Sequence, residues 1–193
     1  MVTLSAETRD PPGDTRLPTT NAWLTMSSTK KVNGDNVGPT DVTSNPLLGT
    51  WHLVRWEITY GDGRTPTLPF GAQATGLICY TGDGTMNACI ARGGRPRLSS
   101  DSVRSAPESQ RLAAFESYFQ YAGPYEIRGV PGQQQVVHSV THSLNPNFVG
   151  TQQVRNMEFA GADKLTLSAS DTLPGSAVAR HHRLVWSRRG QAS

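Results

Sequence analysis

The chain contains little cysteine, no long apolar run and no concentrated charge. Its 193 residues include only two cysteines, Cys79 and Cys89, which is too few for the disulfide framework of a small secreted protein. We therefore expect both to be reduced and buried. No apolar stretch approaches the ~20 residues of a membrane span, and residues 1–14 lack the apolar segment of a secretory signal. These absences predict a cytoplasmic protein without a membrane span.

Several kinds of site are also missing from the sequence. The net charge of +3 comes from scattered basic residues, whereas nucleic-acid binding needs a clustered basic footprint. The sequence has no Gly-x-Gly-x-x-Gly, no Gly-Lys-Ser/Thr loop and no Gly-x-Ser-x-Gly elbow. His138 and His142 lie four residues apart on a predicted strand, about 13 Å, too far to share one zinc ion. We expect no metal, no cofactor and no nucleic-acid partner.

What the sequence does contain is a series of short strands joined by turns. Residues 1–44 are polar, lack periodicity and predict a disordered leader, and residues 190–193 predict a tail. Residues 45–189 predict one domain, an eight-stranded antiparallel up-and-down β-barrel. The strands are expected at 49–60, 75–81, 85–92, 125–130, 135–144, 151–159, 164–169 and 179–188.

One helix is predicted between the third and fourth strands, over residues 106–122. Ser105 and Glu108 match a capping box, and Gly123 occupies the position of a C-terminal glycine. Four apolar side chains recur at helical spacing and predict a face that packs on the barrel: Leu112, Phe115, Phe119 and Ala122.

Several segments resemble one family, the lipocalin-like domain proteins of bacteria and fungi. The resemblance covers about residues 47–189, and the Asn145-Pro146-Asn147 run is its most specific element. The other matching segments are residues 48–54, 69–71, 76–84, 121–125, 143–155 and 184–186. The resemblance implies a calycin-type barrel with an interior cavity, closed at one end by Trp51 beneath an arginine of the last strand. It also implies a carrier of apolar molecules or a cofactor-free enzyme of a natural-product pathway.

Strand alternation predicts which side chains face the cavity, because residues i, i+2 and i+4 share a face. Three inward sets follow: His138, Val140 and His142; Arg155, Met157 and Phe159; and Trp51, Leu53, Arg55 and Glu57. For the first strand the opposite set, Val54, Trp56 and Ile58, is more apolar, so both assignments stay open. The adjacent His181 and His182 face opposite sides, and at most one of them points inward.

The inward imidazoles and guanidinium favour an enzyme. His138, His142 and Arg155 are the candidate catalytic residues, since histidine exchanges protons near neutral pH and arginine holds carbonyl, enolate or carboxylate oxygens. The hypothesis is a cofactor-free cyclase (Diels-Alderase-like), dehydratase or isomerase acting on an apolar polyketide- or terpenoid-like molecule. Candidate ligand-binding residues are Trp51, Leu53, Arg55, Glu57, Tyr80, Tyr118, Tyr121, Val140, Met157 and Phe159.

The alternative function is a non-catalytic carrier of a small hydrophobic molecule. Under that alternative His138 is a hydrogen-bonded structural residue and Arg155 pairs with Glu57 inside the barrel. Buried ionisable groups distinguish the two hypotheses, because a carrier of apolar ligands has less need of them. A monomer and a homodimer are equally compatible with the sequence.

Overall fold

Most of the described chain is β-strand. The computed structural model describes residues 45–172 and 175–188, so the predicted leader and tail lie outside the described residues. Within them no helix is long and apolar enough to cross a membrane. The elements are β1 (Gly49–Tyr60), β2 (Thr75–Tyr80), β3 (Thr85–Ala91), η1 (Val103–Ser105), α1 (Glu108–Glu116), β4 (Tyr118–Arg128), β5 (Gln135–Ser139), β6 (His142–Ser143), η2 (Pro146–Phe148), β7 (Gln152–Phe159), β8 (Lys164–Thr172) and β9 (Ala179–Ser187).

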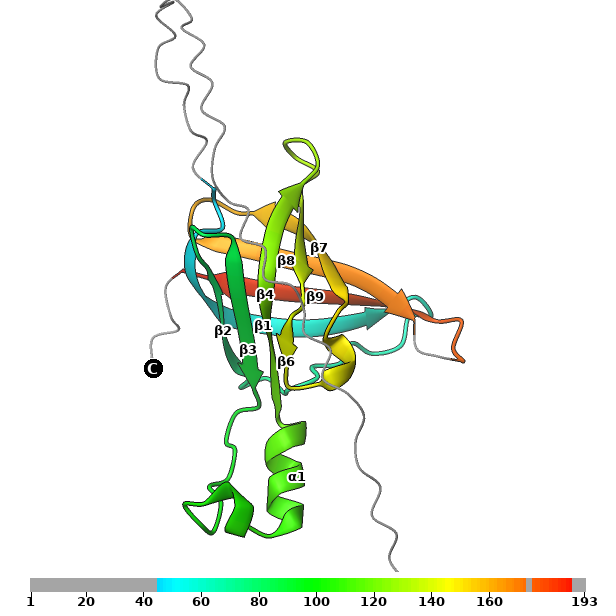
Figure 1. Cartoon of the computed structure of the whole chain (residues 1–193). Coiled ribbons are helices and arrows are strands. Elements are labelled where there is room, and N and C mark those ends of the chain that lie inside the picture. The colour runs from blue at the N-terminus through cyan, green and yellow to red at the C-terminus, as the bar shows by residue number, and fades with distance from the viewer. Residues whose placement is uncertain (1–44, 173–174, 189–193) are drawn as a thin grey trace, which may run out of the picture. The chain divides into compact units, whose positions relative to one another are not determined.

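The strands form one closed antiparallel barrel (Figure 1). Their order is β3-β2-β1-β9-β8-β7-β5-β4, and β3 pairs with β4 to close the circle. The short strand β6 adds a second pairing to β4 beyond the end of β5. Closure leaves no unpaired edge among the eight long strands, which removes the aggregation hazard of an open sheet. The predicted eight-stranded antiparallel barrel with one helix is confirmed.

The helix is shorter than predicted and does not pack on the barrel. Helix α1 ends at Glu116 and β4 begins at Tyr118. Phe119 and Ala122, whose spacing suggested a helix, lie in this strand opposite Ile90 and Asn87 of β3. The predicted capping box is absent: the N-cap residue is Pro107, without a side-chain hydrogen bond. No helix residue is buried.

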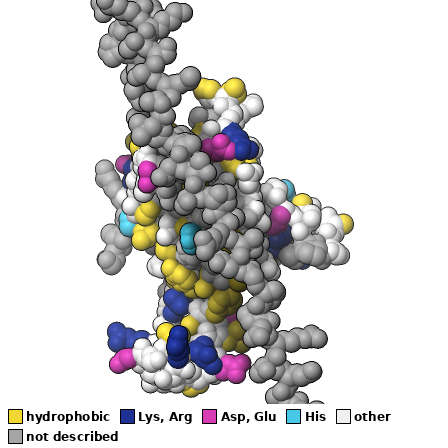
Figure 2. Space-filling model, viewed as in Figure 1, with side chains coloured by type: hydrophobic (Ala, Val, Ile, Leu, Met, Phe, Trp, Pro, Cys, Tyr) yellow, Lys and Arg dark blue, Asp and Glu magenta, His cyan; other side chains and the backbone are white. Residues whose placement is uncertain are grey.

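The face expected to pack on the barrel is instead open. Leu112 and Phe115 are 54% and 49% exposed. Basic side chains gather around α1 and the segment before it (Figure 2). These two segments carry Arg92, Arg95, Arg97, Arg104 and Arg111.

Gly123 has a different role from the predicted helix terminus. It lies within β4, opposite Met86 of β3. A Cβ atom at this position would lie 1.9 Å from the carbonyl oxygen of Ser139. The glycine therefore allows the backbones of β4 and the end of β5 to approach closely.

A β-bulge divides β1 into two parts with opposite inward faces. The pairing with β9 shifts register between Leu53 and Arg55, and one extra residue reverses the alternation. Trp51 and Leu53 are buried before the bulge, and Ile58 is buried after it. The prediction that Arg55 and Glu57 share the face of Trp51 is therefore wrong: they form an ion pair of 2.6 Å on the exterior.

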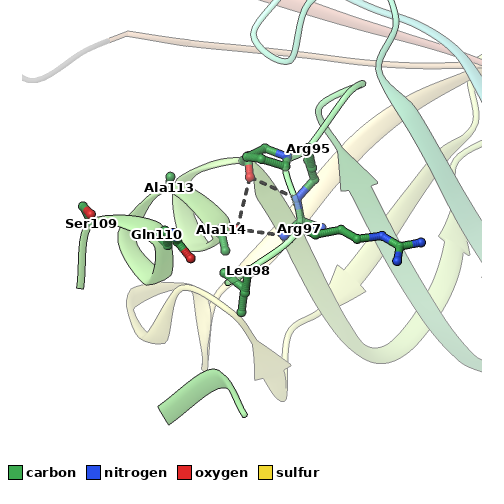
Figure 3. A pocket seen from close by; sticks show the side chains of 9 residues that line it. Arg95, Arg97, Leu98, Ser109, Gln110, Ala113 and Ala114 are labelled. Atoms are coloured by element: carbon green, nitrogen blue, oxygen red, sulfur yellow. Dashed lines mark hydrogen bonds between the residues drawn. The ribbon is translucent and has the colours of Figure 1, made fainter. Parts of the chain in front are cut away.

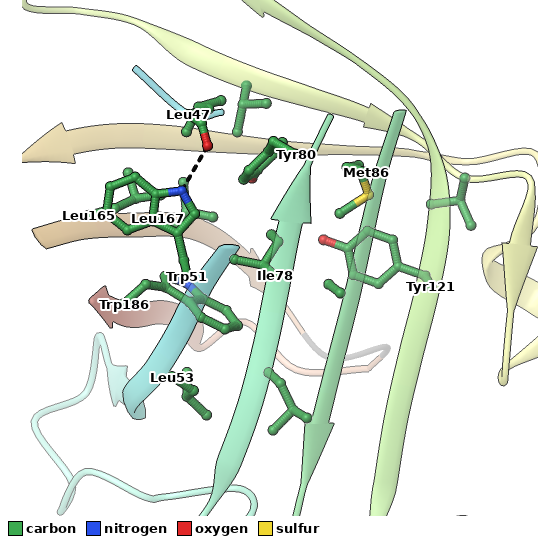
Figure 4. Close-up of a cluster of buried hydrophobic side chains, with 14 residues drawn as sticks. Leu47, Trp51, Leu53, Ile78, Tyr80, Met86, Tyr121, Leu165, Leu167 and Trp186 are labelled. Carbon is green, nitrogen blue, oxygen red and sulfur yellow. Dashed lines mark hydrogen bonds between the residues drawn. The ribbon is translucent and has the colours of Figure 1, made fainter. Parts of the chain in front are cut away.

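One end of the barrel is closed by packed aromatic and aliphatic side chains (Figure 4). Trp51 and Leu47 are fully buried, and the Trp51 indole N–H donates to the Leu47 carbonyl at 2.8 Å. The Arg188 guanidinium lies 4.0 Å from the Trp51 ring centroid and donates to the carbonyls of Leu48 and Pro46, each at 2.7 Å. This arrangement is the one that the resemblance implied.

Cys79 and Cys89 are free but only half-buried, rather than buried as expected.

Candidate ligand-binding site

The end of the barrel opposite Trp51 contains open space. An outer space of about 550 Å³, here called the mouth, adjoins an inner cavity of about 50 Å³. Both are lined by Trp56, Phe119, Arg155 and His182. The mouth adds Phe148, Gln152, Gln153, Val154, Ala169, Ser170, Asp171 and Arg180, and the cavity adds Ile78, Ala88, Ile90, Tyr121, Leu167, Leu184 and Trp186. The mouth has the size of a small-molecule site.

Aromatic rings form one wall of the mouth. Trp56 stacks on Phe70 with ring centroids 5.4 Å apart, and Phe119 lies 6.0 Å from Trp56. Phe148 meets Phe119 edge-to-face at 5.7 Å. Phe148 is positioned by η2, whose N-cap Asn145 accepts a hydrogen bond from the Asn147 N–H at 3.1 Å. The Asn-Pro-Asn run therefore places the Phe148 ring at the mouth.

Arg155 brings a positive charge to both spaces. It projects inward from β7, as the alternation predicted, and is half-buried. Its guanidinium donates to the Gln153 Oε1 at 3.1 Å and to the Val154 carbonyl at 2.9 Å. Among the described residues no carboxylate pairs with it, so the alternative of a pair with Glu57 is wrong. A guanidinium in this position can hold an oxygen atom of a ligand.

A second polar group lies across the mouth, on β8 and β9. Arg180 holds Asp171 through two bonds of 2.8 and 2.7 Å, and the His182 Nε2 lies 3.3 Å from the same carboxylate. Burial acts to raise the pKa of Asp171, but the bonds from Arg180 and His182 outweigh it and lower that pKa. Burial also lowers the pKa of His182, which favours its neutral form. His181 faces the exterior and contacts Ser170.

His138 is fully buried and bonded on both sides by tyrosines. The Tyr80 hydroxyl lies 2.9 Å from Nε2, and the Tyr121 hydroxyl lies 2.8 Å from Nδ1. Burial and the nearby Arg155 lower the pKa of His138 to about 3, so the ring is neutral. One ring nitrogen therefore donates and the other accepts. Burial also raises the pKa of both tyrosines.

The predicted catalytic residues do not converge on one point. His142 is exposed and contacts the Thr141 hydroxyl through Nδ1 at 2.9 Å. The strand breaks between Ser139 and His142, which interrupts the alternation that had placed His142 beside His138. Val140, within the break, is buried in the core. His138 and Arg155 alone of the three face the interior.

The predicted ligand-binding residues fall into three groups. Tyr121 lines the inner cavity. Trp51, Leu53, Tyr80, Val140, Met157 and Phe159 belong to the packed core or lie against it. The remaining residues face outward: Arg55, Glu57 and Tyr118, the last with the Arg95 guanidinium 5.1 Å from its ring.

Most of the mouth was not predicted from the sequence. The alternation left the face of Trp56 open, Phe119 was assigned to the helix, and the charged group on β8 and β9 was not predicted. Two signals were available: the apolar character of the set that contains Trp56, and the His181-His182 pair, of which at most one member could face inward.

A separate groove of about 310 Å³ lies outside the barrel, between α1 and the preceding segment (Figure 3). Arg95 spans it, donating to the Ala114 carbonyl and to the Ser117 hydroxyl, both at 3.0 Å. These bonds attach the helix to the loop before it. Among the described residues no three His, Cys, Asp or Glu side chains gather as a metal-binding group would require.

Comparison with known proteins shows the family of the chain. The family model of the lipocalin-like domain matches residues 48–189. The chain belongs to this family. A similar protein is the 4'-hydroxy-3'-methoxypropiophenone carrier protein ppsC of Aspergillus oryzae (strain ATCC 42149 / RIB 40), 27% identical over 107 residues, which are 53% of this chain and 96% of that protein. Among solved structures, a de novo designed fluorescence-activating β-barrel is 12% identical with a TM-score of 0.34, covering 74% of this lipocalin-like chain and 93% of the design.

Proposed function

We propose that this lipocalin-like protein is a carrier that binds a small, mainly apolar aromatic molecule in the mouth of its barrel. The observation that carries the proposal is the mouth itself, with its wall of Trp56, Phe119 and Phe148. Aromatic walls bind flat apolar molecules through stacked and edge-to-face contacts. The similarity to a protein named as a carrier of an aryl ketone supports the same class of ligand.

The arrangement of the imidazoles favours carriage over the predicted catalysis. His138 uses both ring nitrogens on tyrosine hydroxyls, and its low pKa removes it as a proton acceptor near neutral pH. His142 is on the surface. Neither imidazole is placed to move a proton of a ligand held in the mouth.

One observation favours a second candidate, an enzyme that transfers protons. His182 lines both spaces and contacts the Asp171 carboxylate, and Arg155 lines the same spaces. An imidazole beside a carboxylate and a guanidinium can enolise, dehydrate or isomerise a carbonyl compound. Under this candidate His182, and not His138 or His142, carries the acid–base chemistry.

Titration calorimetry with 4'-hydroxy-3'-methoxypropiophenone, followed by recovery of the compound, tests the proposal. The full chain should bind it saturably, and mass and retention time of the recovered compound should be unchanged. Ala169→Trp, which fills the mouth, should abolish binding, whereas Ala91→Trp, an outward half-buried position on β3, should not. Absence of binding, or equal binding by Ala169→Trp, overturns the proposal. A changed mass or retention time supports the enzyme, since an isomerisation alters only the retention time.

A further inference from the structure

Two tryptophans carry buried indole N–H groups that have no hydrogen-bond partner among the described residues. They are Trp56 on β1 and Trp186 on β9. By contrast, the indole N–H of Trp51 donates to the Leu47 carbonyl. A buried donor left without an acceptor costs stability, and such groups are rare in native proteins.

Both unpartnered indoles line the inner cavity. They come from paired strands, with Trp56 opposite Leu184 and Trp186 opposite Leu53. Arg155 lines the same cavity from β7 and brings further N–H donors. No carboxylate of residues 45–172 or 175–188 lines this cavity, and most of its remaining wall is aliphatic. Tyr121 and His182 also line it and can each donate or accept, whereas the polar groups of Trp56, Trp186 and Arg155 can only donate.

The mouth and the inner cavity differ in volume, so they fit different parts of a ligand. The inner cavity is about 50 Å³, more than the ~30 Å³ share of one water molecule and well below the ~150 Å³ of a cavity that holds benzene. A single oxygen-bearing group fits there, and an aromatic ring does not. The ring has room in the mouth, where the volume is about 550 Å³.

We infer that the ligand carries a hydrogen-bond acceptor oxygen, as an aryl ketone does, and inserts this oxygen into the inner cavity to accept from the indole N–H groups of Trp56 and Trp186. The inference rests on the proposed binding of an aromatic molecule in the mouth and specifies its chemical class. Arg155 adds a charged donor beside the same oxygen. A hydrocarbon of the same shape leaves these donors unsatisfied and binds less favourably.

Two matched probes, propiophenone and propylbenzene, test the inference by calorimetry on the full chain. They share a ring and a three-carbon chain and differ by the carbonyl oxygen. Trp56→Phe and Trp186→Phe each keep an aromatic ring and remove one N–H. Each should lower the ratio of ketone to hydrocarbon affinity, by about tenfold where that N–H makes the main bond. Trp51→Phe is the matched control: its N–H already has an acceptor, so the ratio should not change.

Nitrogen-15 NMR of the wild-type protein gives a second readout that needs no variant. Propiophenone should move an indole N–H resonance of Trp56 or Trp186 downfield, and propylbenzene should not. The inference is wrong, while the proposed function stands, if three results occur together: both probes bind, the ratio of their affinities is the same in all variants, and no indole resonance responds to the ketone. If neither probe binds, both are overturned.

Discussion

The buried His138 should make the protein lose stability as the pH falls below neutrality. Its pKa is about 3 in the folded chain against an ordinary value of 6.5. In the unfolded chain the ring takes up a proton below pH 6.5, and in the folded chain it does not until about pH 3. The unfolded state therefore binds more protons in this window, and acidification favours it.

The size of the effect follows from the proton difference. One proton gained only by the unfolded state changes the free energy of unfolding by about 1.4 kcal/mol per pH unit. Between pH 6.5 and 4.5 His138 should thus account for a loss of roughly 2 to 3 kcal/mol. His182, with its lowered pKa, adds a smaller loss of the same sign. The carboxyls with lowered pKa, such as Asp171, lose their contribution at still lower pH, around and below 3.8.

Urea unfolding at several pH values between 4.5 and 7 measures this loss. His138→Gln keeps a donor and an acceptor for the two tyrosines but does not titrate. It should be less stable than wild type at pH 7 by about 1 to 3 kcal/mol, and the gap should narrow steadily on acidification. His142→Gln, at an exposed imidazole, is the control and should keep the wild-type slope. Parallel curves for wild type and His138→Gln would refute the reasoning.

Three further changes test the closed end, the strand crossing and the mouth. Arg188→Ala removes three hydrogen bonds to backbone carbonyls and the contact of the guanidinium with the Trp51 ring. Urea unfolding should show that the free energy of unfolding falls by about 2 to 4 kcal/mol. An unchanged midpoint would contradict the role of Arg188 in the closed end. Gly123→Ala places a Cβ 1.9 Å from a backbone oxygen and should cost about 3 kcal/mol or more, whereas Gly82→Ala, in open space, should change the thermal midpoint little. Arg155→Met should weaken the binding of a hydroxyaryl ketone about tenfold, as measured by calorimetry. The control is Arg55→Met, at an arginine paired with Glu57 on the exterior, and it should bind with wild-type affinity. Equal affinities of the two variants would show that Arg155 does not contact the ligand.

Regular strands could be predicted from the sequence together with their faces. On β7 the alternation places Arg155, Met157 and Phe159 on one face, and the structure has these side chains half-buried between exposed neighbours. The closed end was also foreseeable, because the resemblance placed Trp51 beneath an arginine and Arg188 is there. In these parts the period of two is unbroken, so pattern and structure agree.

The positions of several other candidate residues could not be predicted, because the strands that carry them are irregular or their residues fit two patterns. One extra residue in β1 exchanges Arg55 and Glu57 for Trp56 on the inward face. A break after β5 turns His142 outward. On β4 the residues around Phe119 fit both a helical and a strand pattern, and pairing with β3 decides between them. The bulge, the break and the strand at Phe119 all depend on contacts between segments far apart in the sequence. The local spacing of apolar residues does not reveal such contacts.

The most direct test of a ligand bound in the mouth is to map intermolecular nuclear Overhauser effects between 4'-hydroxy-3'-methoxypropiophenone and the full chain. Contacts from the ligand ring to Trp56, Phe119 and Phe148 are the predicted result. Contacts confined to the groove beside α1, at Pro96 and Ala113, would place the ligand outside the barrel and contradict the account.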